Sequence, residues 1–130
     1  MCLGQVIKYN MKEWKFGIDN NNLVNLVIEG KKRATTCPYY KEDIPVIGEE
    51  SIILYDNGKK ACKVKTKEYY VMKFSEMTEE LSSLEGEGDL SLEYWRKVHM
   101  DYFTSFDNTF NDESLIIFEI FEVVEILNKK

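Results

Sequence analysis

The first third of the chain predicts one short helix. The cluster 19–22, Asp-Asn-Asn-Asn, is typical of a helix start because these side chains accept hydrogen bonds from the first free N–H groups. Apolar residues then recur at helical spacing, and Gly30 stands where a left-handed C-cap is expected. We therefore expect the helix to end just before the basic run 31–33. The apolar positions are Leu23, Leu26 and Val27.

The pattern changes to β strands after an expected loop from Pro38 to Gly48. Residues 51–55 form a short apolar run, and Asp-Asn-Gly at 56–58 is a strong tight-turn signal. Side chains alternate in character along 60–66, and 67–74 is rich in β-formers. These features predict three strands in the middle of the chain.

A second helix is expected from Ser75, an acceptable N-cap, to the two glycines of 85–88, which break the helical pattern. Asp89 or Ser91 then caps a third helix. Its predicted apolar face comprises Leu92, Trp95, His99, Tyr102 and Phe106. After a polar stretch, residues 115–127 are the strongest strand signal in the chain.

The predicted order of helix, strands, two helices and strand favours an α+β fold. A sheet that joins strands so far apart in sequence is expected to be mixed and to curl into a small barrel, with about three helices packed on it. Residues 1–15 show no clear period and are interpreted as an N-terminal lead-in. Residues 16–127 are then one domain, which suits a chain of 130 residues.

Composition and net charge narrow the classes of binding partner that we expect. The chain is 44% hydrophobic and 31% charged, as in ordinary globular proteins, and its formal net charge is −6. Duplex binding normally needs a basic face, because counterion release supplies most of its affinity. The acidic balance favours a small neutral or cationic ligand, or a short single-stranded segment held in one cleft.

The cysteines point to a reducing compartment. Cys2, Cys37 and Cys62 show no CxxC spacing, so neither a disulfide framework nor a zinc site is expected. We predict no other metal and no cofactor. The chain has no signal-peptide core and no run approaching the roughly 18 apolar residues of a membrane span. The prediction is a cytoplasmic protein.

Candidate chemistry starts at the basic run 31–33, which is followed by Ala-Thr-Thr-Cys. Such a run is usually a solvated turn that complements the helix dipole. The small hydroxylated residues after it favour a loop that lines a pocket. Lys32 and Thr35, three residues apart, point the same way if the lysine ends a turn and the threonine starts a strand. A lysine there would activate a hydroxyl or act as the cation that stabilises an oxyanion.

Three further residues are weighed against ordinary structural roles. Glu85 follows the apolar stripe of the second helix directly, so its carboxylate is expected to turn inward. Near a lysine, an inward carboxylate would be a charge pair or an acid/base partner. His99 lies on an apolar face, where a lone histidine is more often a hydrogen-bonded core residue than a catalyst. Cys37 is more probable as a small buried residue than as a nucleophile.

Several separate motifs together resemble the ASCH family (activating-signal-cointegrator homology domains). The run 30–35, Gly-Lys-Lys-Arg-Ala-Thr, is similar to the signature loop of that family. The stretches 85–89, Glu-Gly-Glu-Gly-Asp, and 92–96, Leu-Glu-Tyr-Trp-Arg, followed by His99, resemble a bacterial branch. The terminal run 118–124 is similar to the closing strand of the same branch, so the resemblance covers nearly the whole chain.

The resemblance implies a PUA-like β-barrel with a cleft beside the signature loop. It also implies a range of functions: RNA binding, ribonuclease action, or hydrolysis of the amide of N4-acetylcytidine. Carried over by motif, the hydrolytic residues are Lys32, Thr35 and Glu85, with Thr35 as nucleophile, Lys32 supporting it and Glu85 moving the proton to the leaving amine. The residues expected to contact a nucleoside or single-stranded RNA are Lys31, Arg33, Thr36, Cys37, Tyr40, Trp95 and His99.

Overall fold

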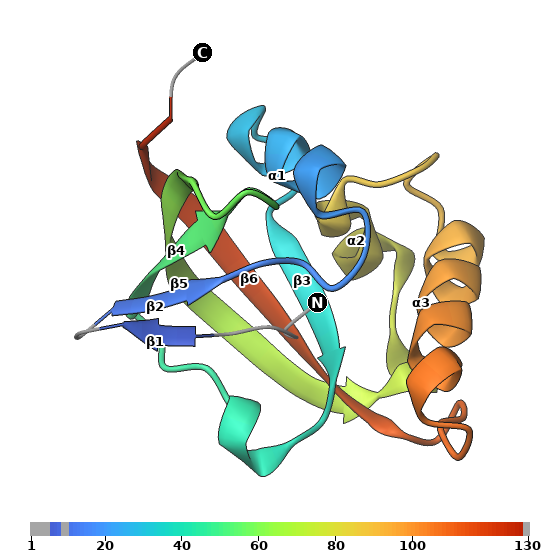
Figure 1. Ribbon diagram of the computed structural model, residues 1–130. Coiled ribbons are helices and arrows are strands. Elements are labelled where there is room, and N and C mark those ends of the chain that lie inside the picture. The colour runs from blue at the N-terminus through green and yellow to red at the C-terminus, as the bar shows by residue number, and fades with distance from the viewer. Residues whose placement is uncertain (1–5, 9–10, 129–130) are drawn as a thin grey trace.

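The computed structural model describes residues 6–8 and 11–128, which form one curled sheet with helices against it (Figure 1). The strand order is β1-β2-β4-β5-β6-β3. Only the β2–β4 pair is parallel, and the other four pairs are antiparallel. The strands are β1 (Val6–Lys8), β2 (Met11–Trp14), β3 (Ala34–Pro38), β4 (Glu50–Leu54), β5 (Lys60–Lys73) and β6 (Leu115–Ile126).

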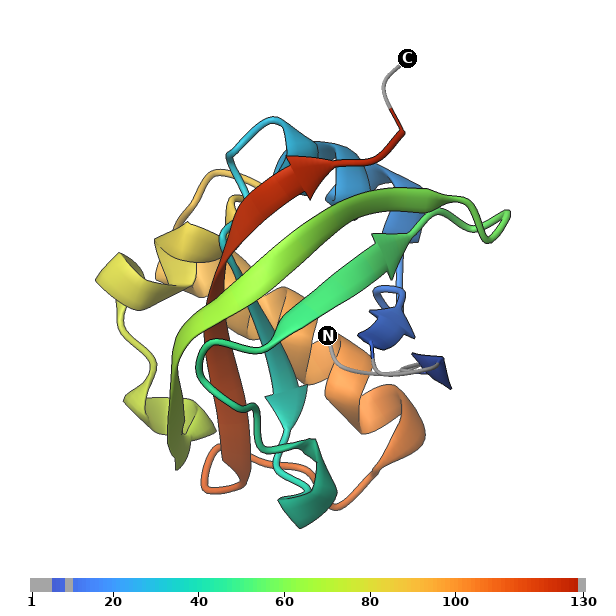
Figure 2. The same ribbon diagram turned by 90° about the vertical axis from the view of Figure 1, so that its left-hand side faces the viewer.

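The α+β class, the mixed sheet and the three helices are confirmed. Helix α1 (Asn20–Ile28) lies at one end of the sheet, and α2 (Glu79–Ser82) and α3 (Leu92–Phe106) lie along one side of it (Figures 1 and 2). Among the described strands, β1 and β3 form the two edges and do not pair with each other, so the barrel is open. No described helix is long and apolar enough to cross a membrane.

The expected lead-in over 1–15 falls partly outside the described residues. Its described part extends the sheet, because β2 pairs with both β1 and β4. Trp14, at the end of β2, is buried in the core beside Phe16.

The segment expected as a lysine–threonine loop is in part a strand. β3 pairs along its whole length with β6, with Thr35 opposite Glu119 and Thr36 opposite Phe118. All five of its residues are buried. Since the sheet interior covers one face of β3 and helices cover the other, its sequence lacks the polar and apolar alternation that identifies a half-exposed strand.

The strands predicted over 60–66 and 67–74 are one continuous strand, β5. Its register against β6 shifts between Lys63 and Val64 and again between Thr66 and Glu68. Such irregularities bend a strand without ending it, which allows a 14-residue strand to follow the curl of the sheet.

The first helix is confirmed, including its end. Gly30 adopts φ +80°, and the N–H groups of Gly30 and Lys31 donate to the carbonyls of Val27 and Leu26. This is the hydrogen-bond pattern of a Schellman motif.

The second helix begins later than predicted. Residues 74–76 form a 3₁₀ turn, and Thr78, not Ser75, caps α2 by accepting from the N–H of Leu81. Ser91, one of the two predicted caps, caps the third helix. The buried face of that helix is Trp95, His99 and Phe103, whereas Phe106 is 44% exposed. Phe103 is buried, and its ring packs edge-on against Phe110 in the following loop.

Candidate functional site

The signature loop and the loop after α2 meet through their backbones. The N–H of Arg33 donates to the carbonyl of Leu84 at 2.7 Å. Gly86 has φ +71°, and a Cβ at that position would lie 2.2 Å from the carbonyl oxygen of Lys31. Only glycine fits both the left-handed conformation and this close approach. The two loops therefore bring Lys32 and Glu85 together from positions 53 residues apart.

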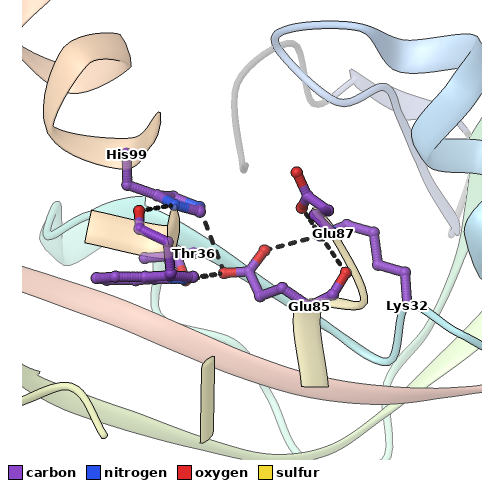
Figure 3. Close-up of polar contacts among 6 residues, drawn as sticks. Lys32, Thr36, Glu85, Glu87 and His99 are labelled. Carbon is purple, nitrogen blue, oxygen red and sulfur yellow. Dashed lines mark hydrogen bonds and ion pairs between the residues drawn. The ribbon is translucent and has the colours of Figure 1, made fainter. Parts of the chain in front are cut away.

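Lys32 points inward and is only 1% exposed. Its Nζ lies 2.7 Å from Oε1 of Glu85 and 2.7 Å from Oε2 of Glu87, as Figure 3 shows. The same ammonium lies 5.3 Å from the centre of the Phe16 ring, within reach of a cation–π interaction. Lys32 is thus a buried cation held by two carboxylates and an aromatic face.

The second oxygen of the Glu85 carboxylate faces β3 and α3. Its Oε2 accepts a hydrogen bond from the hydroxyl of Thr36 and another from Nε1 of Trp95 at 3.0 Å. Nε2 of His99 lies 3.4 Å away and has no hydrogen-bond partner among the described residues. Nδ1 of His99 lies 2.8 Å from the carbonyl oxygen of Trp95, a contact that places a proton on Nδ1.

Both members of the central pair are ionised at neutral pH. Burial pulls the pKa of Lys32 down, but Glu85 and Glu87 outweigh burial and raise that pKa above its ordinary value of 10.5. Burial pushes the pKa of Glu85 up, but the charge of Lys32 and the neighbouring His99 together hold it well below its ordinary value of 4.5. Lys32 is therefore a fixed cation and not a proton acceptor.

The two threonines of β3 face opposite sides of the strand, as consecutive strand residues do. Thr36 faces the helices and contacts Glu85. Thr35 faces the inside of the curled sheet and lines a small cavity with Trp14, Thr66 and Glu119. The structure brings Lys32 and Glu85 together and places Thr36, not Thr35, on the carboxylate.

The other candidate residues are spread over different environments. Lys31 and Arg33 are exposed and line a surface depression of about 660 Å³ with Gly30, Gly86 and Gly88. Cys37 is buried beside Ile117, and Tyr40 is 43% exposed. Trp95 and His99 are buried and stack on each other within the Glu85 environment.

Sequence reasoning missed Glu87 as a partner of Lys32. The signal for it was Gly86, because a glycine with a positive φ between two glutamates reverses the chain and lets both carboxylates face one ammonium. Thr66 and Glu119 were also missed, since they lie in ordinary strand sequence. Within the described residues, no group of three or more His, Cys, Asp or Glu side chains is placed to hold a metal ion.

Comparison with known proteins identifies the family. The model of the ASCH domain matches residues 12–125. An ASCH domain structure from Lactobacillus crispatus JV V101 is similar at 25% identity and a TM-score of 0.79, covering 87% of this chain and 79% of that one. A protein from Enterococcus faecalis V583 is similar at 25% identity and the same TM-score of 0.79, covering 96% and 87%.

No curated protein matches the chain. The structural matches confirm the expected PUA-like fold. Because the family model spans most of its length, the chain belongs to the ASCH domain family.

Proposed function

We propose that this ASCH domain binds a short single-stranded segment of RNA at the depression beside the signature loop. One observation carries the proposal: the loop sends Lys32 into the interior and the residues on either side of it, Lys31 and Arg33, outward into one open depression. Exposed cations around an open surface suit phosphate groups, whereas a buried and paired lysine does not.

The charge around the depression is opposite to that of the whole chain. Its lining contains two cationic side chains and no carboxylate, although the net charge is −6. Lys31 pairs with Glu29 at 3.4 Å, but such an exposed ion pair contributes at most about 1 kcal/mol and a phosphate can replace it. Binding is therefore local, which favours a few nucleotides over a long duplex.

In this proposal the buried charges act as a scaffold. Lys32 holds Glu85 and Glu87, which flank Gly86 in the loop that forms the far wall of the depression. The network fixes the spacing between the two loops, so that Lys31 and Arg33 are presented in one arrangement before RNA arrives. Preorganisation of this kind reduces the entropy lost on binding.

Charge reversal tests the proposal. We expect Lys31→Glu/Arg33→Glu to weaken binding of a labelled single-stranded RNA at least ~10-fold, measured by fluorescence anisotropy. The salt dependence of binding should also become weaker, because each lost phosphate contact reduces the slope of log K against log salt by about 0.7. The control, Lys59→Glu/Lys67→Glu, makes the same change in net charge at two exposed residues outside the depression. An equal loss of affinity in both variants would show that only net charge matters.

Hydrolysis of an N-acylated cytidine is the second candidate function. The observation in its favour is the Lys32–Glu85 contact at 2.7 Å, which keeps a carboxylate ionised in the interior. In this mechanism a threonine hydroxyl attacks the amide carbonyl and passes its proton to Glu85, while Lys32 stabilises the oxyanion. Glu85 gives that proton to the leaving amine as the C–N bond breaks, and water then hydrolyses the acyl-threonine ester, which releases the acid and restores the hydroxyl. The geometry offers two hydroxyls, Thr36 on Glu85 and Thr35 on the opposite face of β3.

Chromatography of N4-acetylcytidine reactions separates the alternatives. If Thr35 is the nucleophile, Thr35→Val should lower cytidine release at least ~10-fold, while Thr36→Val retains more activity. Turnover by the unmodified protein no greater than that of Lys32→Ala would exclude this substrate. The labelled RNA from the binding assay, separated on a denaturing gel after long incubation, tests the remaining alternative of metal-independent ribonuclease action.

A further inference from the structure

An exposed aromatic ring lies beside the depression that contains Lys31 and Arg33. Tyr94, in the first turn of α3, is 39% exposed. Its ring contacts the loop after α2, because a Cβ at Gly88 would lie between 2.6 and 2.7 Å from three carbons of that ring. Gly88 itself lines the depression. Neither proposed function uses Tyr94.

We propose that Tyr94 is a stacking platform for one unpaired base of an RNA whose phosphates lie at Lys31 and Arg33. This inference rests on the proposed RNA binding and makes its ligand more specific. The RNA has to present a free base next to the contacted phosphates, which a duplex with paired and stacked bases does not do.

The Tyr94 ring lies flat against Gly88. The three ring carbons are neighbours, Cδ2, Cε2 and Cζ, and a Cβ at Gly88 would be almost equally far from all three. Only points above the centre of a ring are equally far from three of its neighbouring atoms, so Gly88 covers one face of the ring and not its edge. The exposed part of the ring is therefore its other face and its edges. Contact with Gly88 also fixes the orientation of the ring before RNA arrives, which reduces the entropy lost on binding.

The two aromatic residues expected to contact the ligand are not available at this depression. Trp95 is 3% exposed and stacks on His99 in the interior. Tyr40 lies beyond the opposite end of β3 from the signature loop and does not line the depression. Tyr94 is adjacent to Trp95 in sequence but lies on a different face of α3, because successive helix residues are about 100° apart.

The charges near Tyr94 direct a base, and not a phosphate, toward the ring. A second depression adjoins the first, and its charged lining residues are Glu79, Glu80 and Asp89. Leu90 lines both depressions, and Ser91, which lines the acidic one, accepts a hydrogen bond from the N–H of Tyr94. The carboxylates repel phosphates but not an uncharged base. The RNA backbone therefore stays at Lys31 and Arg33 while a base extends to Tyr94.

Replacement of Tyr94 tests the platform. We expect Tyr94→Leu to weaken binding of the labelled single-stranded RNA at least ~5-fold in fluorescence anisotropy, the ratio given by the lower end of the stacking energy of one base on an aromatic ring. The slope of log K against log salt should not change, because Lys31 and Arg33 remain. Tyr94→Phe keeps the ring and should bind within about two-fold of the unmodified protein. The matched control is Tyr70→Leu, which removes an exposed tyrosine on β5 outside both depressions and should not weaken binding.

An abasic oligomer shows whether the ring contacts a base. The oligomer has the length and charge of the labelled RNA but carries no bases. The unmodified protein should bind it at least ~5-fold more weakly than the RNA, and Tyr94→Leu should bind it as tightly as the unmodified protein does, because the partner of the ring is already missing. Thermal melts show whether each variant is folded.

The outcomes separate the platform from RNA binding itself. No binding by the unmodified protein, or equal binding by Lys31→Glu/Arg33→Glu, overturns both. Weakened binding in that charge variant with unchanged binding in folded Tyr94→Leu overturns the platform alone. The platform is also overturned if the unmodified protein binds the abasic oligomer as tightly as the RNA, a result that needs no variant. A loss in Tyr94→Phe as large as that in Tyr94→Leu would overturn it as well, since stacking needs only the ring.

Discussion

Replacing Lys32 with methionine is expected to lower the free energy of unfolding by about 3–5 kcal/mol, because the change leaves the Glu85 carboxylate buried without its cation. Methionine retains most of the length of the side chain, so the lost charge and not a cavity is the main effect. Urea unfolding followed by tryptophan fluorescence measures the change. Lys31→Met is the matched control: the neighbouring lysine is 67% exposed at its side chain, and its replacement should cost less than about 0.5 kcal/mol.

A double variant shows whether the charge is the cause. Lys32→Met/Glu85→Leu removes both ions, and a buried pair replaced by apolar residues is often close to neutral in stability. We therefore expect it to recover part of the loss, even though Thr36 and Trp95 lose their acceptor on Glu85. If Lys32→Met were as stable as Lys31→Met, the ion pair would make no net contribution to the fold.

The sequence predicted those elements whose signals are local. Helix α1 followed from its polar start and its glycine end, and β6 from a long run of β-formers. In contrast, β3 is buried on both faces and shows no alternation of polar and apolar residues, so only its pairing with β6, about 80 residues later, makes it a strand. The later start of α2 follows from the 3₁₀ turn at 74–76, because such turns commonly precede an α-helix and Ser75 alone does not distinguish the two.

The site was predictable only in part, for a similar reason. An inward Glu85 followed from its place after an apolar stripe, and the lysine–glutamate contact followed from the family resemblance. Which threonine faces the Glu85 carboxylate depends on which residues of β3 point to each side of the strand. A shift of one residue exchanges the two faces. The expectation that Lys32 and Thr35 point the same way assumed that the lysine ends a turn and that the threonine starts a strand. The strand starts one residue earlier, at Ala34, and it turns Thr36 toward Glu85 and Thr35 into the cavity.

The second large expected effect is the loss of folding stability at acid pH. Burial is the largest single influence on the pKa of Glu85 and raises it, but the charge of Lys32 and the neighbouring His99 together outweigh burial and hold that pKa well below its ordinary value of 4.5. A carboxyl group with a depressed pKa in the folded state contributes stability that is fully present above its unfolded pKa and is lost as pH falls through the folded one. Lys32 has a raised pKa, so its contribution is present below 10.5 and is lost as pH rises through its folded value. The contribution of this pair to the free energy of unfolding should therefore be constant between about pH 4.5 and pH 10.5.

Glu85→Gln should separate the contribution of this carboxylate from that of the other acidic groups. At pH 7 we expect a loss of about 3 kcal/mol, because the neutral amide no longer balances Lys32 and satisfies fewer of the donors around it. The difference from the unmodified protein should shrink as pH falls below about 4.5, where the native carboxylate begins to lose its advantage. Urea midpoints measured from pH 2 to pH 8 give the curve, with Glu93→Gln on the exposed side of α3 as the control. A difference that stays constant across that range would mean that Glu85 supports the fold through packing and neutral hydrogen bonds alone, and that the buried charge pair is not what joins the signature loop to the loop after α2.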